Sequence, residues 1–95
     1  MNAADALAHV AAIIRQRGEN YGDARANMAE TAKRMSLTLN TTVTSATVCL
    51  LMLDVKLARL RATPTHLDSI LDLMGYASLL AEIVSTSSDR DDLLA

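Results

Sequence analysis

Helical periodicity with almost no interruption is the feature that most constrains this chain. Apolar residues recur every three or four positions over four segments, and only one proline and three glycines are available to break them. A β-sandwich or barrel needs many more turn residues than this. The apolar content is Ala, Leu, Met, Val and Ile with only two aromatic residues, as in a helical core. The sequence therefore predicts an all-α fold: a single small four-helix domain over residues 1–84 and a frayed tail over residues 85–95.

Local signals set the expected helix bounds. Gly18 suits the end of the first helix, because glycine adopts left-handed geometry at little cost. Asp23 is a good N-cap for the second helix. Pro64 ends the third helix, and Thr65 caps the fourth. We expect helices over residues 3–17, 24–37, 46–62 and 66–84.

The last two helices carry more apolar surface than one face each. Residues 48–60 are apolar nearly all round, as in a central helix or one buried in an oligomer interface. A chain this short buries only about 60% of its unfolded surface. We therefore expect a homodimer or homotetramer built on the third and fourth helices; a monomer with fully wrapped helices is the alternative. The expected inward stripe of the fourth helix is Leu67, Ile70, Leu71, Met74, Ala77, Ala81 and Val84, with Leu73, Leu79, Leu80 and Ile83 outside it.

Charge and apolar run length restrict the partners and the compartment. Nine basic and eleven acidic residues give a net charge of −2, which argues against electrostatic binding of a nucleic-acid polymer. No apolar run approaches the ~20 residues of a membrane span, and no basic leader precedes the first helix. One cysteine fits a reducing compartment. We expect a cytoplasmic protein without a membrane partner.

Two carboxylates on the fourth helix form the first candidate site. Asp68, Asp72 and Tyr76 are spaced four residues apart and share one helix face. The carboxylates are candidate ligands for Mg²⁺, which prefers hard oxygen donors. An ion pair with a neighbouring helix, or simple capping, is the alternative. Gly75 beside them suggests close helix approach or room for a ligand, and His66 lies close enough to contribute.

Two further stretches complete the candidate site. Lys56 and Arg59 share one face near the end of the third helix, where they could meet a phosphate or pair with Asp68 or Asp72. Tyr21 and Asn27 flank a glycine-containing turn and could contact a base or sugar; a packing turn is the alternative. No nucleophile–base pair, zinc spacing or P-loop is present, so whether the protein is an enzyme stays open.

Three motifs together resemble a family of small, all-helical phage and prophage proteins of unassigned function. They are R-G-x-x-Y-G-D-x-x-x-N (17–27), K-x-A-R-L (56–60) and P-T-H-x-D-S-x-x-D-x-x-G-Y-A (64–77). The family is distantly similar to domains associated with nucleotide modification and to the MazG-like all-α nucleoside triphosphate pyrophosphatases. A phage-encoded chain would work in the host-cell cytoplasm.

The resemblance implies an oligomer that binds a nucleotide or its phosphates, with Mg²⁺ held by carboxylates of adjacent helices. The E-x-x-E and E-x-x-D motifs of the MazG-like group are absent here. The absence of these motifs argues more strongly against pyrophosphohydrolysis than against nucleotide binding. A helical interaction or accessory protein of phage origin, without a small-molecule site, is the other hypothesis. Its polar motifs would fix the packing register between helices.

Overall fold

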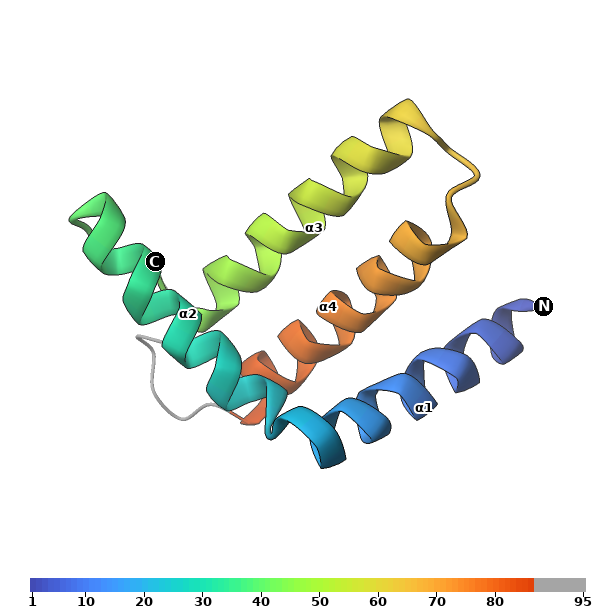
Figure 1. Cartoon of the computed structure of the whole chain (residues 1–95), viewed down its shortest axis with the longest axis horizontal. Coiled ribbons are helices and arrows are strands. Elements are labelled where there is room, and N and C mark those ends of the chain that lie inside the picture. The colour runs from blue at the N-terminus through green and yellow to red at the C-terminus, as the bar shows by residue number, and fades with distance from the viewer. Residues whose placement is uncertain (87–95) are drawn as a thin grey trace.

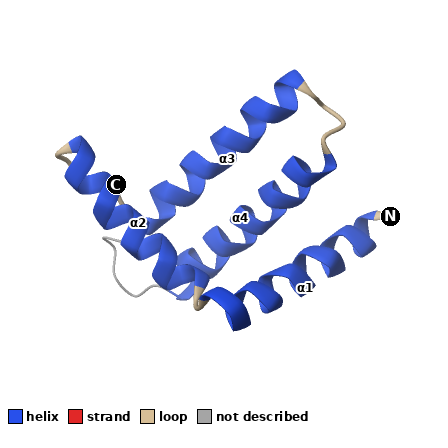
Figure 2. Cartoon of the chain, viewed as in Figure 1, coloured by secondary structure: helices blue, strands red, loops and turns tan. Residues whose placement is uncertain are grey.

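The fold is all-α, as predicted. The computed structural model describes residues 1–86, apart from the Tyr21 side chain, and this part contains no strand (Figure 2). The expected tail over residues 85–95 lies outside the described residues, except for Ser85 and Thr86, which are helical. The helices are α1 (Ala3–Tyr21), α2 (Ala24–Leu39), α3 (Ser45–Ala62) and α4 (Leu67–Thr86).

Three of the helices lie side by side. Helices α3 and α4 form an antiparallel hairpin, α1 lies along the other side of α4, and α2 crosses one end of this layer (Figure 1). Of the two expected places for the apolar helix over residues 48–60, the centre of the fold is not the one observed, because α3 packs mainly on α4 and α2, whereas α4 packs on α3, α1 and α2. Its burial in an oligomer interface stays a prediction. Helix α3 occupies one edge of the layer.

Helix α1 runs one turn further than predicted. Gly18 is helical, and the helix ends at Gly22, whose φ of 81° favours glycine. Asn2 caps its start through reciprocal bonds with Asp5, a signal that the prediction missed. Asp23 caps α2 as predicted, accepting a 3.1 Å bond from the Arg25 N–H.

Side-chain hydroxyls hold the link between α2 and α3. Asn40 ends α2 in left-handed geometry, with φ 53°. Just before it, the Ser36 hydroxyl donates to the Ala32 carbonyl at 2.7 Å and accepts the Val43 N–H at 2.9 Å. Thr44 caps α3 by accepting the Thr47 N–H at 3.2 Å. These bonds fix the direction in which the chain leaves α2.

Helix α4 begins at Leu67, one residue later than predicted. His66, rather than Thr65, directly precedes it, and the His66 carbonyl accepts the Ile70 N–H at 3.3 Å. Asp68 is therefore the second helical residue, and Thr65 does not directly precede the helix as a cap would. As an acidic residue in the first turn it still complements the helix dipole.

The core is small and divided into two clusters. One cluster joins α2 to the start of α3 through Ala32, Val43 and Val48. The other joins α3 to the end of α4 through Ala46, Cys49 and Ile83. Burial raises the pKa of the Cys49 thiol above its usual range. Partly buried side chains that pack around the two clusters are Met28, Met35, Met52, Leu79 and Leu80.

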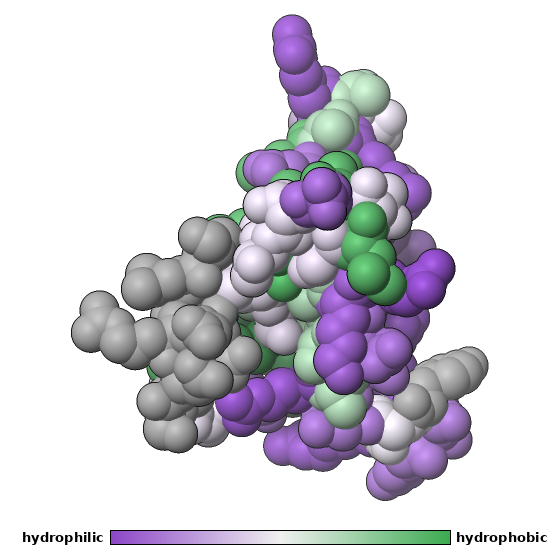
Figure 3. Space-filling model, turned by 90° about the vertical axis from the view of Figure 1, so that its left-hand side faces the viewer, coloured by the Kyte–Doolittle hydropathy of each residue, from purple (hydrophilic) through white to green (hydrophobic). Residues whose placement is uncertain are grey.

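Many large apolar side chains remain exposed. Leu50, Leu57 and Ile70 keep 51%, 53% and 37% of their surface, although each lies on one of the two helices with the most apolar sequence. The stripe expected to face inward from α4 is mostly exposed, whereas Leu79, Leu80 and Ile83 pack inward. The side nearest α2 also shows hydrophobic atoms among hydrophilic ones (Figure 3).

Within the described residues, none of the helices combines the length and apolar character needed to cross a membrane.

Candidate functional site

An ion pair joins α3 and α4, the two helices that pack most extensively against each other. The Lys56 Nζ of α3 lies 3.0 Å from Oδ2 of Asp72 on α4. The Lys56 side chain is only 11% exposed, whereas that of Asp72 is 48% exposed. The Lys56 side chain is therefore almost buried where it meets the half-exposed carboxylate of Asp72. Of the two alternatives for Lys56, the structure shows the ion pair, and its partner is Asp72.

The Lys56–Asp72 pair lies on the same face of the layer as α2. Helix α2 crosses that face at the end of the layer away from the pair. Asp72 comes seven residues before Leu79. Leu79 and Met28 of α2 both pack against the same core cluster. Residues seven apart share a helix face. Arg59 follows Met52 by the same interval, and Met52 also packs around an α2 cluster. Arg59 and Asp72 therefore lie on the same side of the molecule.

Two exposed charged residues flank this pair. Arg59 lies one turn beyond Lys56 on α3, and Asp68 lies one turn before Asp72 on α4. Both are exposed to solvent. We call the group formed by Lys56, Arg59, Asp68 and Asp72 the polar seam. It combines an exposed arginine, an almost buried lysine and two exposed carboxylates. These residues belong to the half of the α3–α4 hairpin that lies away from α2 (Figure 1).

Two other predicted residues lie close to the polar seam along the chain. Tyr76 is partly buried, one turn beyond Asp72 on α4. His66 is exposed at the start of α4, where its Nδ1 lies 2.7 Å from Oγ of the fully buried Ser69. The histidine thus has an internal hydrogen-bond partner at the helix start. Gly75 has open space where a side chain would be, which favours room over close helix approach.

The turn that precedes α2 is not brought to the polar seam within one chain. Arg25, two residues before Asn27, donates a side-chain hydrogen bond to the hydroxyl of Thr86 at the far end of α4. Thr86 and Asp72 are fourteen residues apart, or about 21 Å along the helix. Asn27 therefore lies at the opposite end of the layer from Lys56. Tyr21 ends α1 at the same turn, and its side chain lies outside what the structure describes.

The carboxylates of the seam supply few metal ligands. Within the described residues, no three His, Cys, Asp or Glu side chains come close enough together to hold a metal ion. Asp68 and Asp72 are two oxygen donors, and Asp72 already pairs with Lys56. A magnesium ion here would keep several of its waters, as Mg²⁺ commonly does in proteins.

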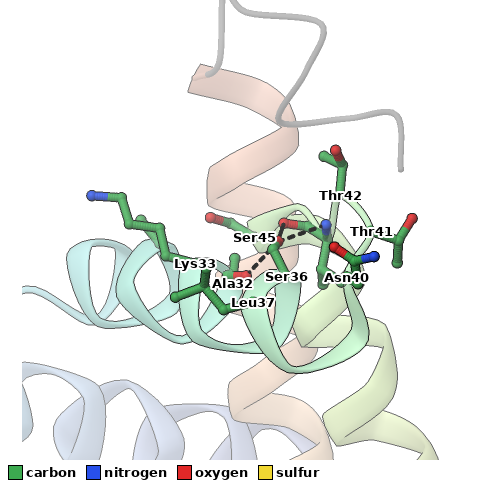
Figure 4. A pocket seen from close by; sticks show the side chains of 10 residues that line it. Ala32, Lys33, Ser36, Leu37, Asn40, Thr41, Thr42 and Ser45 are labelled. Carbon is green, nitrogen blue, oxygen red and sulfur yellow. Dashed lines mark hydrogen bonds between the residues drawn. The ribbon is translucent and has the colours of Figure 1, made fainter.

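A separate hollow lies beside α2 and was missed by the sequence reasoning. It has a volume of about 690 Å³, and its lining includes Lys33, Ser36, Asn40 and Thr42 (Figure 4). The Ser36 hydroxyl is already engaged in the link to α3. Lys33 points away from the loop and lies 3.8 Å from Glu30 one turn earlier. The only sequence signal here was the polar run 40–42, which is typical of any loop.

The family of the chain follows from a match over most of its length. Residues 5–84 match a family described as a domain of unknown function, DUF6378, and the chain belongs to it. The matched region contains all four helices up to Val84. The family match therefore covers nearly all of the four-helix domain.

One curated relative comes from a phage. The Gene 55 protein of Mycobacterium phage D29 is 35% identical over 68 residues, which are 72% of this chain. Those residues cover 45% of the phage protein, so the chain spans less than half of that relative's length. The expected kinship with phage proteins is confirmed. No solved structure matches the chain.

Proposed function

We propose that this protein binds a phosphate-bearing nucleotide at the polar seam. The observation that carries the proposal is the Lys56–Asp72 pair, in which an almost buried ammonium is held beneath a half-exposed carboxylate. Burial of an ion pair carries a desolvation cost, and the attraction between the two charges often does not offset it. Such a pair at an open face suits ligand contact as well as helix packing.

The residues around the pair have complementary roles. Arg59 is exposed, and its planar guanidinium can grip a phosphate through two hydrogen bonds. Asp68 and Asp72 would accept hydrogen bonds from a ribose or hold Mg²⁺ through its waters. The open space at Gly75 and the partly buried ring of Tyr76 give a neighbouring group room to pack. The motifs that contain these residues also resemble nucleotide-associated phage domains and MazG-like pyrophosphatases.

Binding is proposed rather than turnover. Hydrolysis of a pyrophosphate bond with a metal needs an oriented water as well as charge stabilisation. The seam offers two carboxylates, one of them paired with lysine. The Asn27 turn is not part of this site within one chain, since it lies at the other end of α4.

A thermal-shift panel of ribo- and deoxyribonucleotides, each with and without Mg²⁺, tests the proposal. A nucleotide at 100 times its Kd stabilises the native state by about 2.7 kcal/mol. In a domain this small we expect a rise in melting temperature of roughly 10 °C. A panel without any shift at millimolar nucleotide would contradict the proposal.

Two arginines provide a matched pair of variants. Arg59 and Arg61 are both exposed in the last turn of α3, but they point about 160° apart around the helix. Arg59→Ala should abolish the nucleotide-induced shift, whereas Arg61→Ala should retain it. Equal losses in the two variants would show that binding is not at the seam.

A helical interaction protein without a small-molecule site is the second candidate. It is favoured by the way the polar motifs are satisfied internally, through Lys56 with Asp72 and His66 with Ser69. Under this function Asp72→Asn lowers the melting temperature and no nucleotide raises it. A nucleotide-dependent shift that Arg59→Ala removes would exclude it as the whole account.

A further inference from the structure

Helix α4 carries an apolar stripe that is mostly exposed, with Leu73 and Met74 partly buried. Leu67, Ile70 and Val84 keep 50%, 37% and 50% of their surface, and the two alanines between them are also exposed. No charged residue interrupts these positions. The members of this α4 stripe are Leu67, Ile70, Leu73, Met74, Ala77, Ala81 and Val84.

The spacing of the stripe suits pairing with another helix. Ile70, Ala77 and Val84 are seven residues apart, and Leu73 and Met74 fill the intermediate position of the first repeat. A repeat of this kind keeps one seam facing a partner helix. The fourteen residues from Ile70 to Val84 extend over about 21 Å, or roughly four turns. Small side chains at the centre permit close approach of a second backbone.

The stripe is widened by α3 on the same side of the layer. Leu50 and Leu57 are seven residues apart and both are about half exposed. They lie on the flank of α3 away from Met52, the residue that packs with α2. The apolar surface thus continues from α4 across the hairpin. Soluble monomers rarely expose a continuous patch of this kind.

The opposite face of the layer carries the polar seam. Ile70 is two residues from Asp68 and two from Asp72, which places it about 160° around the helix from each. Coverage of the stripe therefore leaves the seam exposed. The two surfaces can be tested separately, and this inference does not depend on the proposed function.

We infer that a second copy of this chain covers the α4 stripe. Stable domains have at least two packed layers, whereas α1, α4 and α3 form one layer that α2 crosses only at its end. Only eight apolar residues are buried in the described part of the chain. A short chain buries a low fraction of its surface and is correspondingly marginal in stability. Pairing of this stripe with a second copy would enlarge the buried apolar surface without requiring a different protein.

In a two-fold symmetric dimer, the α4 stripe of one copy would pack against the α4 stripe of the other. In such an interface the same patch serves both copies, so an uncharged stripe meets an uncharged stripe without charge repulsion. Ala77 lies midway between Ile70 and Val84. It therefore faces its own counterpart whether the paired helices run parallel in register or antiparallel about the centre.

Sedimentation velocity of the full chain gives the first test. The wild-type protein should sediment at twice its 10.2 kDa mass at tens of micromolar. Ala81→Glu places a charge in the stripe and should raise the dissociation constant at least 100-fold. Ala12→Glu, on the exposed outer side of α1, is the matched control and should remain dimeric. Far-UV circular dichroism checks that both variants are helical.

Disulfide trapping supplies a test that does not depend on a charged substitution. Ala77→Cys should form a covalent dimer under mild oxidation, because the two thiols lie opposite each other. Cys49 does not compete, since it is fully buried. A cysteine at Ala12 should give no such product. A wild-type monomer at these concentrations, or equal effects of the Ala81 and Ala12 substitutions, overturns the inference and leaves the stripe to a different protein.

Discussion

Lys56 and Asp72 make unequal contributions to the stability of the molecule. The lysine side chain is almost fully buried, whereas the aspartate is half exposed. A buried charge that loses its partner cannot recover its hydration, but an exposed one can. The pair should therefore respond differently according to which member is removed.

Asp72→Ala should destabilise the protein more than Lys56→Met does. The alanine variant leaves the buried ammonium without its carboxylate and should cost about 2–3 kcal/mol. Methionine retains much of the packing of the lysine stem and leaves an aspartate that water reaches, so its cost should stay below about 1 kcal/mol. Urea denaturation at a fixed protein concentration measures both. The reverse order would contradict the assigned burial.

The sequence indicated this pairing but not its register. Antiparallel packing of α3 and α4 follows from the short connection at Pro64, and it brings Lys56 towards both Asp68 and Asp72. The two carboxylates differ by one helical turn, which periodicity cannot resolve. In the observed register of α3 against α4, Cys49 packs with Ile83 and Lys56 meets Asp72.

At the scale of the element, Gly75 weakens α4 without an evident packing need. A Cβ built at this position meets no atom within 4 Å. Glycine inside a helix costs up to about 1 kcal/mol relative to alanine. A residue of this kind in the middle of a twenty-residue helix is consistent with room kept for a ligand.

Gly75→Ala should stabilise the unliganded protein by about 0.5–1 kcal/mol. The new methyl group has space, and the unfolded chain loses conformational freedom. Thermal or urea unfolding at constant protein concentration measures the change. A loss of stability would mean that α4 has a close neighbour at this point. Under the proposed function, the same variant should also reduce the nucleotide-induced shift.

The orientation of α4 shows the limit of pattern reading. Apolar residues lie almost all round this helix, so periodicity alone cannot tell the packed face from the open one. The face with the longest regular stripe is exposed, and Leu80 and Ile83 on another face pack against α3. The presence of four helices and the all-α fold class were predictable, because both depend on the local spacing of apolar residues. The identity of the packed face depends on neighbours far away in the sequence.

At the scale of the whole molecule, the helices form a layer with an uncovered side. The small core in two clusters leaves much of the apolar surface of the described residues exposed. The sequence predicted excess apolar surface on the last two helices, but it could not show that α1, α4 and α3 lie side by side. It also could not separate the Asn27 turn from the seam, because their distance depends on how α2 crosses the layer.

The melting temperature should rise with protein concentration. Unfolding of a dimer releases two chains, so a tenfold increase in concentration adds about 1.4 kcal/mol of stability per dimer. For a dimer of this size we expect a rise of roughly 3–5 °C. Differential scanning calorimetry over two decades of concentration measures it. The Ala81→Glu variant should melt lower and independently of concentration, and a concentration-independent wild type would argue against the dimer.

The placement of Asp72 and Ile70 on opposite sides of one helix has a geometric consequence for an assembly. Two copies joined through their apolar faces would point their polar seams outward in opposite directions. Such an assembly would be bivalent, because each seam would be reached separately from solvent and neither would block the other. A ligand that carries two phosphate groups on a long enough tether could then bridge two assemblies, whereas one with a single phosphate would occupy each seam alone.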